Sequence, residues 1–153
     1  MHTFPFYTHT TPMKNSIIHK LSNFITCGAF GWCLECFWTG LHSIRDKQDK
    51  RLLCHTSVWM FPIYGLAAFI EPISRKIKGH SFFFRGSIYM LCIYTAEFFT
   101  GTILKKHEAC PWDYSGVKNN INGIIRLDFA PLWFATGLAF ERLLKRGSPE
   151  TKA

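Results

Sequence analysis

The stretch that decides the fold is LSNFITCGAFGWCLECFWTGLHSI, residues 21–44. It is 24 residues long, and its only acidic or basic side chains are Glu35 and His42. A helix of about 20 apolar residues crosses the hydrocarbon core of a bilayer, so this stretch predicts a transmembrane helix. A carboxylate at that depth costs about 2.5–3.5 kcal/mol on insertion scales, which makes Glu35 a candidate functional residue.

A second stretch has the same character. GSIYMLCIYTAEFFTGTIL, residues 86–104, holds Glu97 as its only charged side chain. Two more segments are apolar enough to be candidate spans. One has no formal charge, and the other has charges only near its ends. We therefore predict an all-α integral membrane bundle of about four transmembrane helices, with a structured loop before the last. The predicted spans are residues 23–43, 52–70, 85–104 and 127–144.

Prolines mark the less regular segments. Pro62 predicts a kink inside the second span, and Pro72 predicts its end. Pro131 suits the first turn of the last helix. The uncharged part of that helix, residues 129–140, is only 12 residues long. A re-entrant or interfacial helix is therefore an alternative to a full fourth span.

The remaining sequence is polar. Residues 1–20 have no continuous apolar core, so we predict a disordered tail rather than a signal peptide, with Met13 as an alternative start to Met1. Residues 21–145 form the predicted single transmembrane domain, and residues 146–153 form a polar C-terminal tail.

Charge and motifs restrict the function. The net charge is +8, but the basic residues lie in short clusters at the ends of the apolar segments. This pattern is typical of anchoring at anionic lipid, so the bilayer is the predicted partner and nucleic acid is excluded. The six cysteines show neither a disulfide framework nor zinc spacing, and no cofactor or metal is predicted. Nucleotide-binding, zinc-protease and serine-hydrolase motifs are absent from the sequence.

Helical spacing suggests where the two glutamates face. Residues three, four and seven apart share a helix face, and that count puts Gly28, Gly31, Thr39 and His42 beside Glu35. Turning the polar seams of three spans toward one another encloses Glu35, Tyr64, Tyr94 and Glu97 in one interior. Two carboxylates there need a shared proton, a ligand, or a basic group such as His42, His55 or Arg126. Alternatively, each glutamate is a structural hydrogen bond between helices.

Three blocks of sequence carry a family likeness. They are HTSVWMFPIYG at residues 55–65, YTAEFFTG at 94–101, and PWDYS at 111–115 followed by NGIIRL at 122–127. Together they resemble the ABC-transporter type IV permease (CmpB-like) family of bacteria and the related eukaryotic transmembrane protein 229 family. The resemblance implies a multi-pass membrane protein, located in the cell membrane if bacterial. The chain departs from the bacterial pattern around Lys105 and at residues 52–55, which weakens any transfer of a transport role.

The W-D-Y-S block predicts an ordered loop. Trp112 and Tyr114 suit the headgroup level of a bilayer. Asp113 is expected to cap a turn or to pair with Arg126, and Asn122-Gly123 fits a tight turn because both residues tolerate positive φ. The loop either plugs the mouth of the bundle, forms a lid whose polar groups contact an incoming ligand, or docks a partner.

These observations favour a permease-like or small-ligand/ion-binding component. The alternatives are a non-catalytic structural or assembly subunit, and an intramembrane lipid-modifying enzyme that uses the two carboxylates as acid and base. Four helices enclose little volume, so a homo-oligomer or a separate ATP-binding subunit is an expected partner. The predicted binding residues are Glu35, Tyr64, Tyr94, Glu97, Trp112, Asp113, Tyr114, Asn122 and Arg126.

Overall fold

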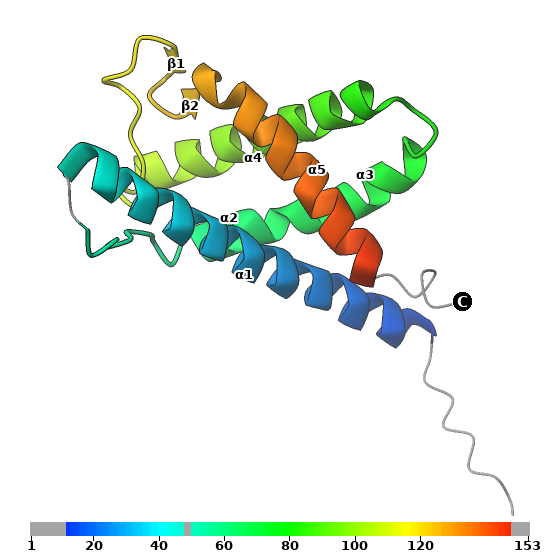
Figure 1. Cartoon of the computed structure of the whole chain (residues 1–153). Coiled ribbons are helices and arrows are strands. Elements are labelled where there is room, and N and C mark those ends of the chain that lie inside the picture. The colour runs from blue at the N-terminus through cyan, green and yellow to red at the C-terminus, as the bar shows by residue number, and fades with distance from the viewer. Residues whose placement is uncertain (1–11, 48–49, 148–153) are drawn as a thin grey trace, which may run out of the picture.

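A computed structural model describes residues 12–47 and 50–147 of the chain, and these residues are mostly helical (Figure 1). The helical class agrees with the prediction. The elements in chain order are helices α1 (Pro12–Lys47), α2 (Met60–Gly65), η1 (Leu66–Phe69), α3 (Ile70–Lys76) and α4 (Phe82–Lys106), strands β1 (Asn120–Ile121) and β2 (Ile125–Arg126), and helices η2 (Leu127–Phe129) and α5 (Ala130–Gly147).

Two of the described helices are long and apolar enough to cross a membrane. They are Ser16–Ser43 within α1 and Phe82–Lys106, which is α4. Both contain predicted spans, the first and the third. The ends of α4 carry ordinary helix signals. At its N-terminus, the Ser81 hydroxyl accepts a hydrogen bond from the backbone N–H of Phe84 at 3.3 Å. At its C-terminus, two lysines lie in the last turn, where their positive charge interacts favourably with the helix dipole.

The second predicted span has different boundaries in the structure. Residues 52–59 form no helix, and helical structure runs from Met60 to Lys76, past Pro72. This corrects both the start at residue 52 and the end at Pro72. Pro62 lies in the first turn of α2, where its missing N–H costs nothing. Pro72 has no N–H to donate to the carbonyl of Ala68, as a regular α-helix would require. The tighter 3₁₀ turn η1 compensates for this loss, because the backbone N–H of Ile70 bonds to the Ala68 carbonyl instead.

The N-terminal boundary also differs from the prediction. Helix α1 begins at Pro12, so residues 12–20 are helical and do not belong to a disordered tail. Two contacts fix these first turns to α3. His19 lies 3.1 Å from Glu71 Oε1, and the Asn23 amide donates to Glu71 Oε2 at 2.6 Å. The rest of the predicted N-terminal tail, residues 1–11, and most of the C-terminal one, residues 148–153, lie outside the described residues.

The start of the last helix and the turn before it agree with the features predicted from the sequence. Helix α5 begins at Ala130, and Pro131 lies in its first turn. Strands β1 and β2 pair antiparallel, with Ile121 opposite Ile125. The turn between them has Asn122 at φ 55° and Gly123 at φ 68°. Two successive residues with positive φ are the mark of a tight hairpin turn, as predicted.

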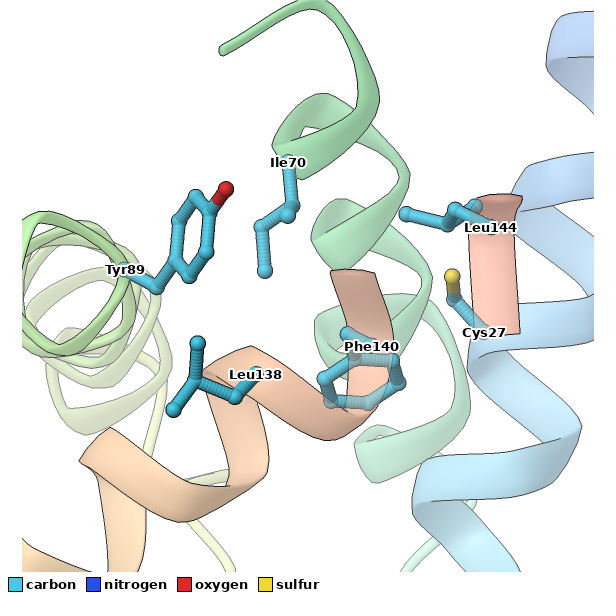
Figure 2. Packing of buried hydrophobic residues seen from close by; sticks show 6 residues of the cluster. All are labelled: Cys27, Ile70, Tyr89, Leu138, Phe140 and Leu144. Atoms are coloured by element: carbon cyan, nitrogen blue, oxygen red, sulfur yellow. The ribbon is translucent and has the colours of Figure 1, made fainter. Parts of the chain in front are cut away.

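The helices pack around one small core. Helix α1 packs on α2 and η1, α4 packs on α5, and α5 also contacts α3. Figure 2 shows six buried side chains from α1, α3, α4 and α5 that meet there: Cys27, Ile70, Tyr89, Leu138, Phe140 and Leu144. By contrast, large rings remain on the outside, with Phe37 67% exposed, Phe83 74% and Phe99 63%. Hydrocarbon rather than water is the natural surrounding for such a surface.

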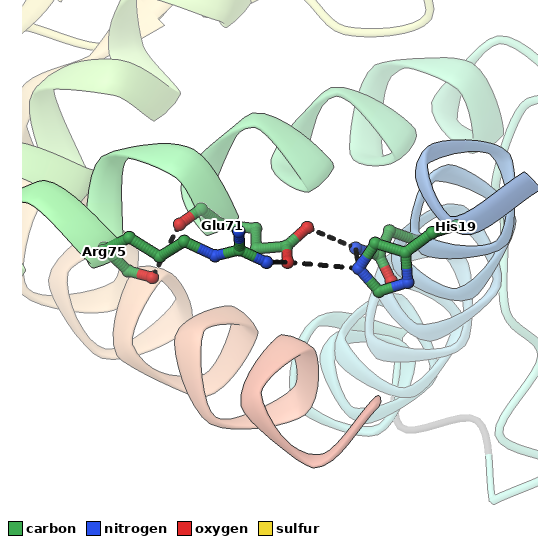
Figure 3. A network of polar contacts seen from close by, with 5 residues as sticks. His19, Glu71 and Arg75 are labelled. Carbon is green, nitrogen blue, oxygen red and sulfur yellow. Dashed lines mark hydrogen bonds and ion pairs between the residues drawn. The ribbon is translucent and has the colours of Figure 1, made fainter. Parts of the chain in front are cut away.

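Two carboxylates, the partly buried Glu71 and the buried Glu141, join helices near the end of the bundle where α1 begins and α5 ends. In Figure 3, His19 of α1 and Arg75 of α3 both reach Glu71. Glu141 of α5 is only 2% exposed and pairs with Arg85 Nη2 at 3.2 Å and with Lys145 Nζ at 2.7 Å. The hydrogen bonds to Glu71 hold α1 to α3, and the Arg85–Glu141 ion pair holds α4 to α5.

The hairpin turn supports a first prediction. Replacing Gly123 with alanine should lower the free energy of unfolding by about 1–2 kcal/mol, because a side chain disfavours positive φ. The new Cβ would also lie 2.9 Å from Asp113 Oδ1. Thermal unfolding in detergent measures the effect. Gly116→Ala is the matched control, since no atom lies within 4 Å of the Cβ it would add. Equal stability of the two variants would contradict the assignment of the turn.

Candidate functional site

Four helices converge on a cavity at the hairpin end of the bundle. The cavity measures about 360 Å³ and both glutamates line it, Glu35 from the C-terminal half of α1 and Glu97 from the C-terminal half of α4. Tyr64 of α2 and Trp133 of α5 complete the wall. The alternating directions of the helices, visible in Figure 1, bring these parts of the chain to the same end.

Glycines on α1 let α2 approach closely. A Cβ at Gly28 would lie 2.8 Å from the carbonyl oxygen of Phe61, and a Cβ at Gly31 would overlap the ring of Tyr64. The predicted seam of small residues therefore faces α2. This contact carries Tyr64 to the carboxylate one turn further along α1, where its hydroxyl donates a short hydrogen bond to Glu35 Oε2.

Glu97 has a weaker partner. Its Oε2 is buried and makes no well-formed hydrogen bond to any of the described residues. The indole Nε1 of Trp133, in the same cavity wall, is also buried and interacts with the Glu97 carboxylate, but the contact falls short of hydrogen-bond geometry. Most buried polar groups in proteins are paired, and an unpaired one costs about 1–3 kcal/mol. Glu97 is therefore an incompletely satisfied acceptor at the wall of a cavity.

The loop after α4 covers the cavity. Trp112 and Tyr114 both line it, and the Trp112 indole N–H donates to the carbonyl of Ile124 at 3.0 Å. The backbone N–H of Tyr114 donates to the carbonyl of Gly123 at 2.8 Å. Burial raises the pKa of the Tyr114 hydroxyl, and the nearby charges of Glu97 and Glu35 raise it further. Tyr114 is thus placed close to both carboxylates.

Four predicted site residues do not line this cavity: Tyr94, Asn122, Asp113 and Arg126. The Tyr94 hydroxyl donates to the backbone carbonyls of Arg126 at 3.2 Å and Leu127 at 3.1 Å, so it fastens α4 to the hairpin. Asn122 contributes its positive φ to the turn, and its carbonyl accepts from Lys105 Nζ at 3.0 Å.

Asp113 and Arg126 do not form the expected pair. Asp113 Oδ1 accepts from the backbone N–H of Ser115 at 3.0 Å and from its hydroxyl at 2.6 Å, and these bonds lower the pKa of Asp113. Asp113 thus caps a turn, which was the other expectation. Arg126 Nε lies 3.6 Å from Asp128, and its guanidinium carbon lies 4.6 Å from the centre of the Phe129 ring. Each charge is engaged by a near neighbour in sequence.

Arg126 lines a second space beside the cavity. This space measures about 500 Å³ and shares Glu35, Tyr64, Tyr114 and Trp133 with the first. Of the predicted basic candidates, His55 lines both spaces, and His42 and Arg126 line only the second. No group of three or more His, Cys, Asp or Glu suited to a metal ion occurs among residues 12–47 and 50–147.

Trp133 is the main cavity residue that the sequence analysis missed. It lies in an apolar run with no neighbouring charge, so it reads as an ordinary core residue. A signal was present, since Thr136 lies three positions later on the same face of α5. Trp133 and Thr136 both line the second space and a third one, an apolar groove.

That groove measures about 600 Å³ and lies between α2–α3 and α4. Aliphatic and aromatic side chains form most of its wall. It shares Tyr64, Glu97, Trp112 and Trp133 with the 360 Å³ cavity. Glu97 therefore borders both a polar and an apolar space.

Sequence comparison adds one family. A model of the family described as "Putative ABC-transporter type IV" matches residues 22–149. The match includes every residue that lines the cavity. No solved structure matches the chain.

Proposed function

Because the chain belongs to the ABC-transporter type IV family, we propose that it is a permease-like component that binds a small ligand or ion between Glu35 and Glu97. Family membership and two candidate membrane spans indicate a transport-related membrane protein. The observation that carries the finer proposal is the buried Oε2 of Glu97, which lies beside a cavity and makes no well-formed hydrogen bond to the described residues. A cation or a hydrogen-bond donor in the cavity would satisfy this atom.

We propose four membrane crossings: α1, the continuous helical stretch from α2 to α3, α4, and α5. Helix α5 has 18 residues, which is about 27 Å of helix and close to the thickness of a bilayer core. The start of α1 and the end of α5 lie at the same end of the bundle in Figure 1. An even number of crossings accounts for that arrangement.

The proposed partners follow from what the chain lacks and from its size. Its sequence contains no nucleotide-binding motif, so ATP-driven transport would require a separate ATP-binding subunit. A cavity of about 360 Å³ has room for a small ligand, and a bundle of this size encloses little further volume for a transport pathway. A homo-oligomer or a second membrane subunit would supply the rest.

A structural role is the second candidate. The hydrogen bond from Tyr64 to Glu35 joins two helices, as a structural glutamate would. It explains Glu97 less well, because the contact of this carboxylate with Trp133 of α5 falls short of hydrogen-bond geometry. The two candidates therefore differ most at Glu97.

The test compares wild type with the Glu35→Gln/Glu97→Gln double variant in nanodiscs. Thermal unfolding is measured against a panel of alkali cations, small ammonium ions and neutral solutes. A ligand at 100 times its dissociation constant stabilises a protein by about 2.7 kcal/mol. We expect at least one solute to stabilise wild type to this degree and to lose its effect on the double variant.

Glutamine retains hydrogen-bonding capacity at both positions, so the double variant should fold. Glu108→Gln is the matched control, because Glu108 is exposed beyond the end of α4. It should respond like wild type. Solutes that stabilise the double variant equally, or a panel with no effect on wild type, would contradict the proposal.

A further inference from the structure

We propose that the ligand is a lipophilic ammonium compound, with its cationic head in the 360 Å³ cavity and its hydrocarbon chain in the adjoining groove. This inference rests on the proposed function and specifies the chemical class of the ligand.

The walls of the cavity suit a bulky organic cation. Four aromatic rings surround the space, those of Tyr64, Trp112, Tyr114 and Trp133. A cation over the face of such a ring is attracted by the ring quadrupole, and cages of aromatic rings are a known means of recognising quaternary ammonium groups. Glu35 and Glu97 add two carboxylates to the same wall.

The charges in the cavity select for a cation. No lysine or arginine among the described residues lines it, so an anionic head would face two carboxylates without compensation. The Tyr64 hydroxyl already donates to Glu35, whereas Glu97 Oε2 has no well-formed hydrogen bond. We therefore assign Glu97 as the main counter-charge for a ligand. A quaternary ammonium group needs charge compensation but no hydrogen-bond acceptor, which fits a site built mainly from rings.

The groove suits a hydrocarbon chain. Its volume of about 600 Å³ lies within the usual range of small-molecule sites, and its wall includes Ile63, Ile70 and Ile88. The groove adjoins the cavity, because the two spaces share five lining residues, including Glu97. A molecule with a charged head and an apolar tail would therefore occupy both spaces at once, with the head–tail junction beside that carboxylate.

The experiment measures saturable binding of radiolabelled dodecyltrimethylammonium to the full chain in nanodiscs, with empty nanodiscs as background. Three unlabelled competitors separate head from tail. Tetramethylammonium has the head alone, dodecanol has the tail without charge, and dodecyl sulfate has the tail with the opposite charge. We expect saturable binding to wild type, with each of the three competing at least about tenfold more weakly than unlabelled dodecyltrimethylammonium. Equal competition by dodecanol or dodecyl sulfate would overturn the assignment, and this comparison needs no variant.

Variants locate the binding. Glu97→Gln should weaken binding at least about tenfold because it removes the counter-charge, and Trp133→Leu should weaken it severalfold because it removes one ring. Glu108→Gln, the same chemical change outside the cavity, should leave it unchanged. Unchanged binding in both cavity variants would overturn the inference.

Other outcomes separate this inference from the proposed function. Suppose dodecyltrimethylammonium fails to saturate, while a small cation stabilises wild type and not Glu97→Gln. The assigned ligand class is then wrong and the proposed function stands. If no solute acts through Glu35 or Glu97, both are wrong.

Discussion

Replacing Glu141 with alanine is expected to lower the free energy of unfolding by about 3–5 kcal/mol, the range for breaking one side of a buried ion pair. Glu141 is 2% exposed, and its two carboxylate oxygens bond Arg85 of α4 and Lys145 of its own helix. Removing the carboxylate leaves the Arg85 guanidinium, itself only 22% exposed, without that counter-charge. The contact between α4 and α5 should loosen as a result.

Denaturant unfolding in detergent, followed by circular dichroism, measures this loss. Arg142→Ala is the control, because it removes an exposed charge from the adjacent position on α5. It should change stability by less than about 0.5 kcal/mol. The double variant Arg85→Met/Glu141→Leu should recover most of the lost stability, since apolar pairs often replace buried ion pairs without cost. A loss below about 1 kcal/mol in Glu141→Ala would show that the pair does not hold the helices together.

Replacing Gly31 with leucine is expected to cost about 2–3 kcal/mol, toward the upper part of the range for overpacking. Even the first carbon of that side chain would overlap the Tyr64 ring. Helix α2 must then move away from α1, which separates the Tyr64 hydroxyl from Glu35. Leucine is a better helix former than glycine by nearly 1 kcal/mol, so a net loss of stability has to come from the helix–helix contact.

The same unfolding assay measures this effect. Gly79→Leu is the control, because no atom lies within 4 Å of a Cβ added at Gly79. It should leave stability nearly unchanged. In Gly31→Leu, ligand binding in the cavity should fall together with stability, because the Tyr64 side of the wall has moved. A Gly31→Leu protein as stable as the control would contradict the close approach of α1 and α2.

The parts of the fold that the sequence predicted are those governed by local rules. Two long segments with one central carboxylate each became α1 and α4, because span length and composition are sufficient for that inference. The Asn122-Gly123 turn followed from the tolerance of these residues for positive φ. The small seam beside Glu35 predicted correctly which face of α1 meets another helix.

The predictions that were wrong concern features that local sequence rules do not determine. Residues 52–59 belong to an apolar segment that was predicted to be helical, yet they form no helix. The helical stretch starts at Met60, two residues before Pro62. Hydrophobicity alone does not identify a helix start. The opposite charges of Asp113 and Arg126 suggested an ion pair as one possibility. Instead, Asp113 accepts a hydrogen bond from Ser115, and Arg126 lies beside Asp128. Contacts between residues near in sequence were available to both side chains, and such contacts require little ordering of the chain.

The placement of Tyr94 shows the limit of helical counting. Tyr94 and Glu97 are three residues apart, which leaves their directions about 60° apart around the helix. That angle is enough to send Tyr94 to the hairpin backbone and Glu97 to the cavity. Trp133 was missed for a related reason, because the one local sign in α5, Thr136 on the same face, does not identify a site whose other walls come from three other helices.

The proposed site requires that Glu35 of α1 and Glu97 of α4 border one cavity. Intramolecular cross-linking tests it directly. Cysteines are placed at positions 35 and 97 in a variant that lacks the six native cysteines. The variant is treated in membranes with a short reagent that bridges two thiols, and the product is analysed by mass spectrometry. The control pair is 35 with 103, because Ile103 lies on α4 but is 58% exposed and borders no cavity described above.

We predict a bridge between positions 35 and 97 within one chain and little or none in the control pair. Separate modification of the two thiols without a bridge, or equal bridging in both pairs, would contradict it.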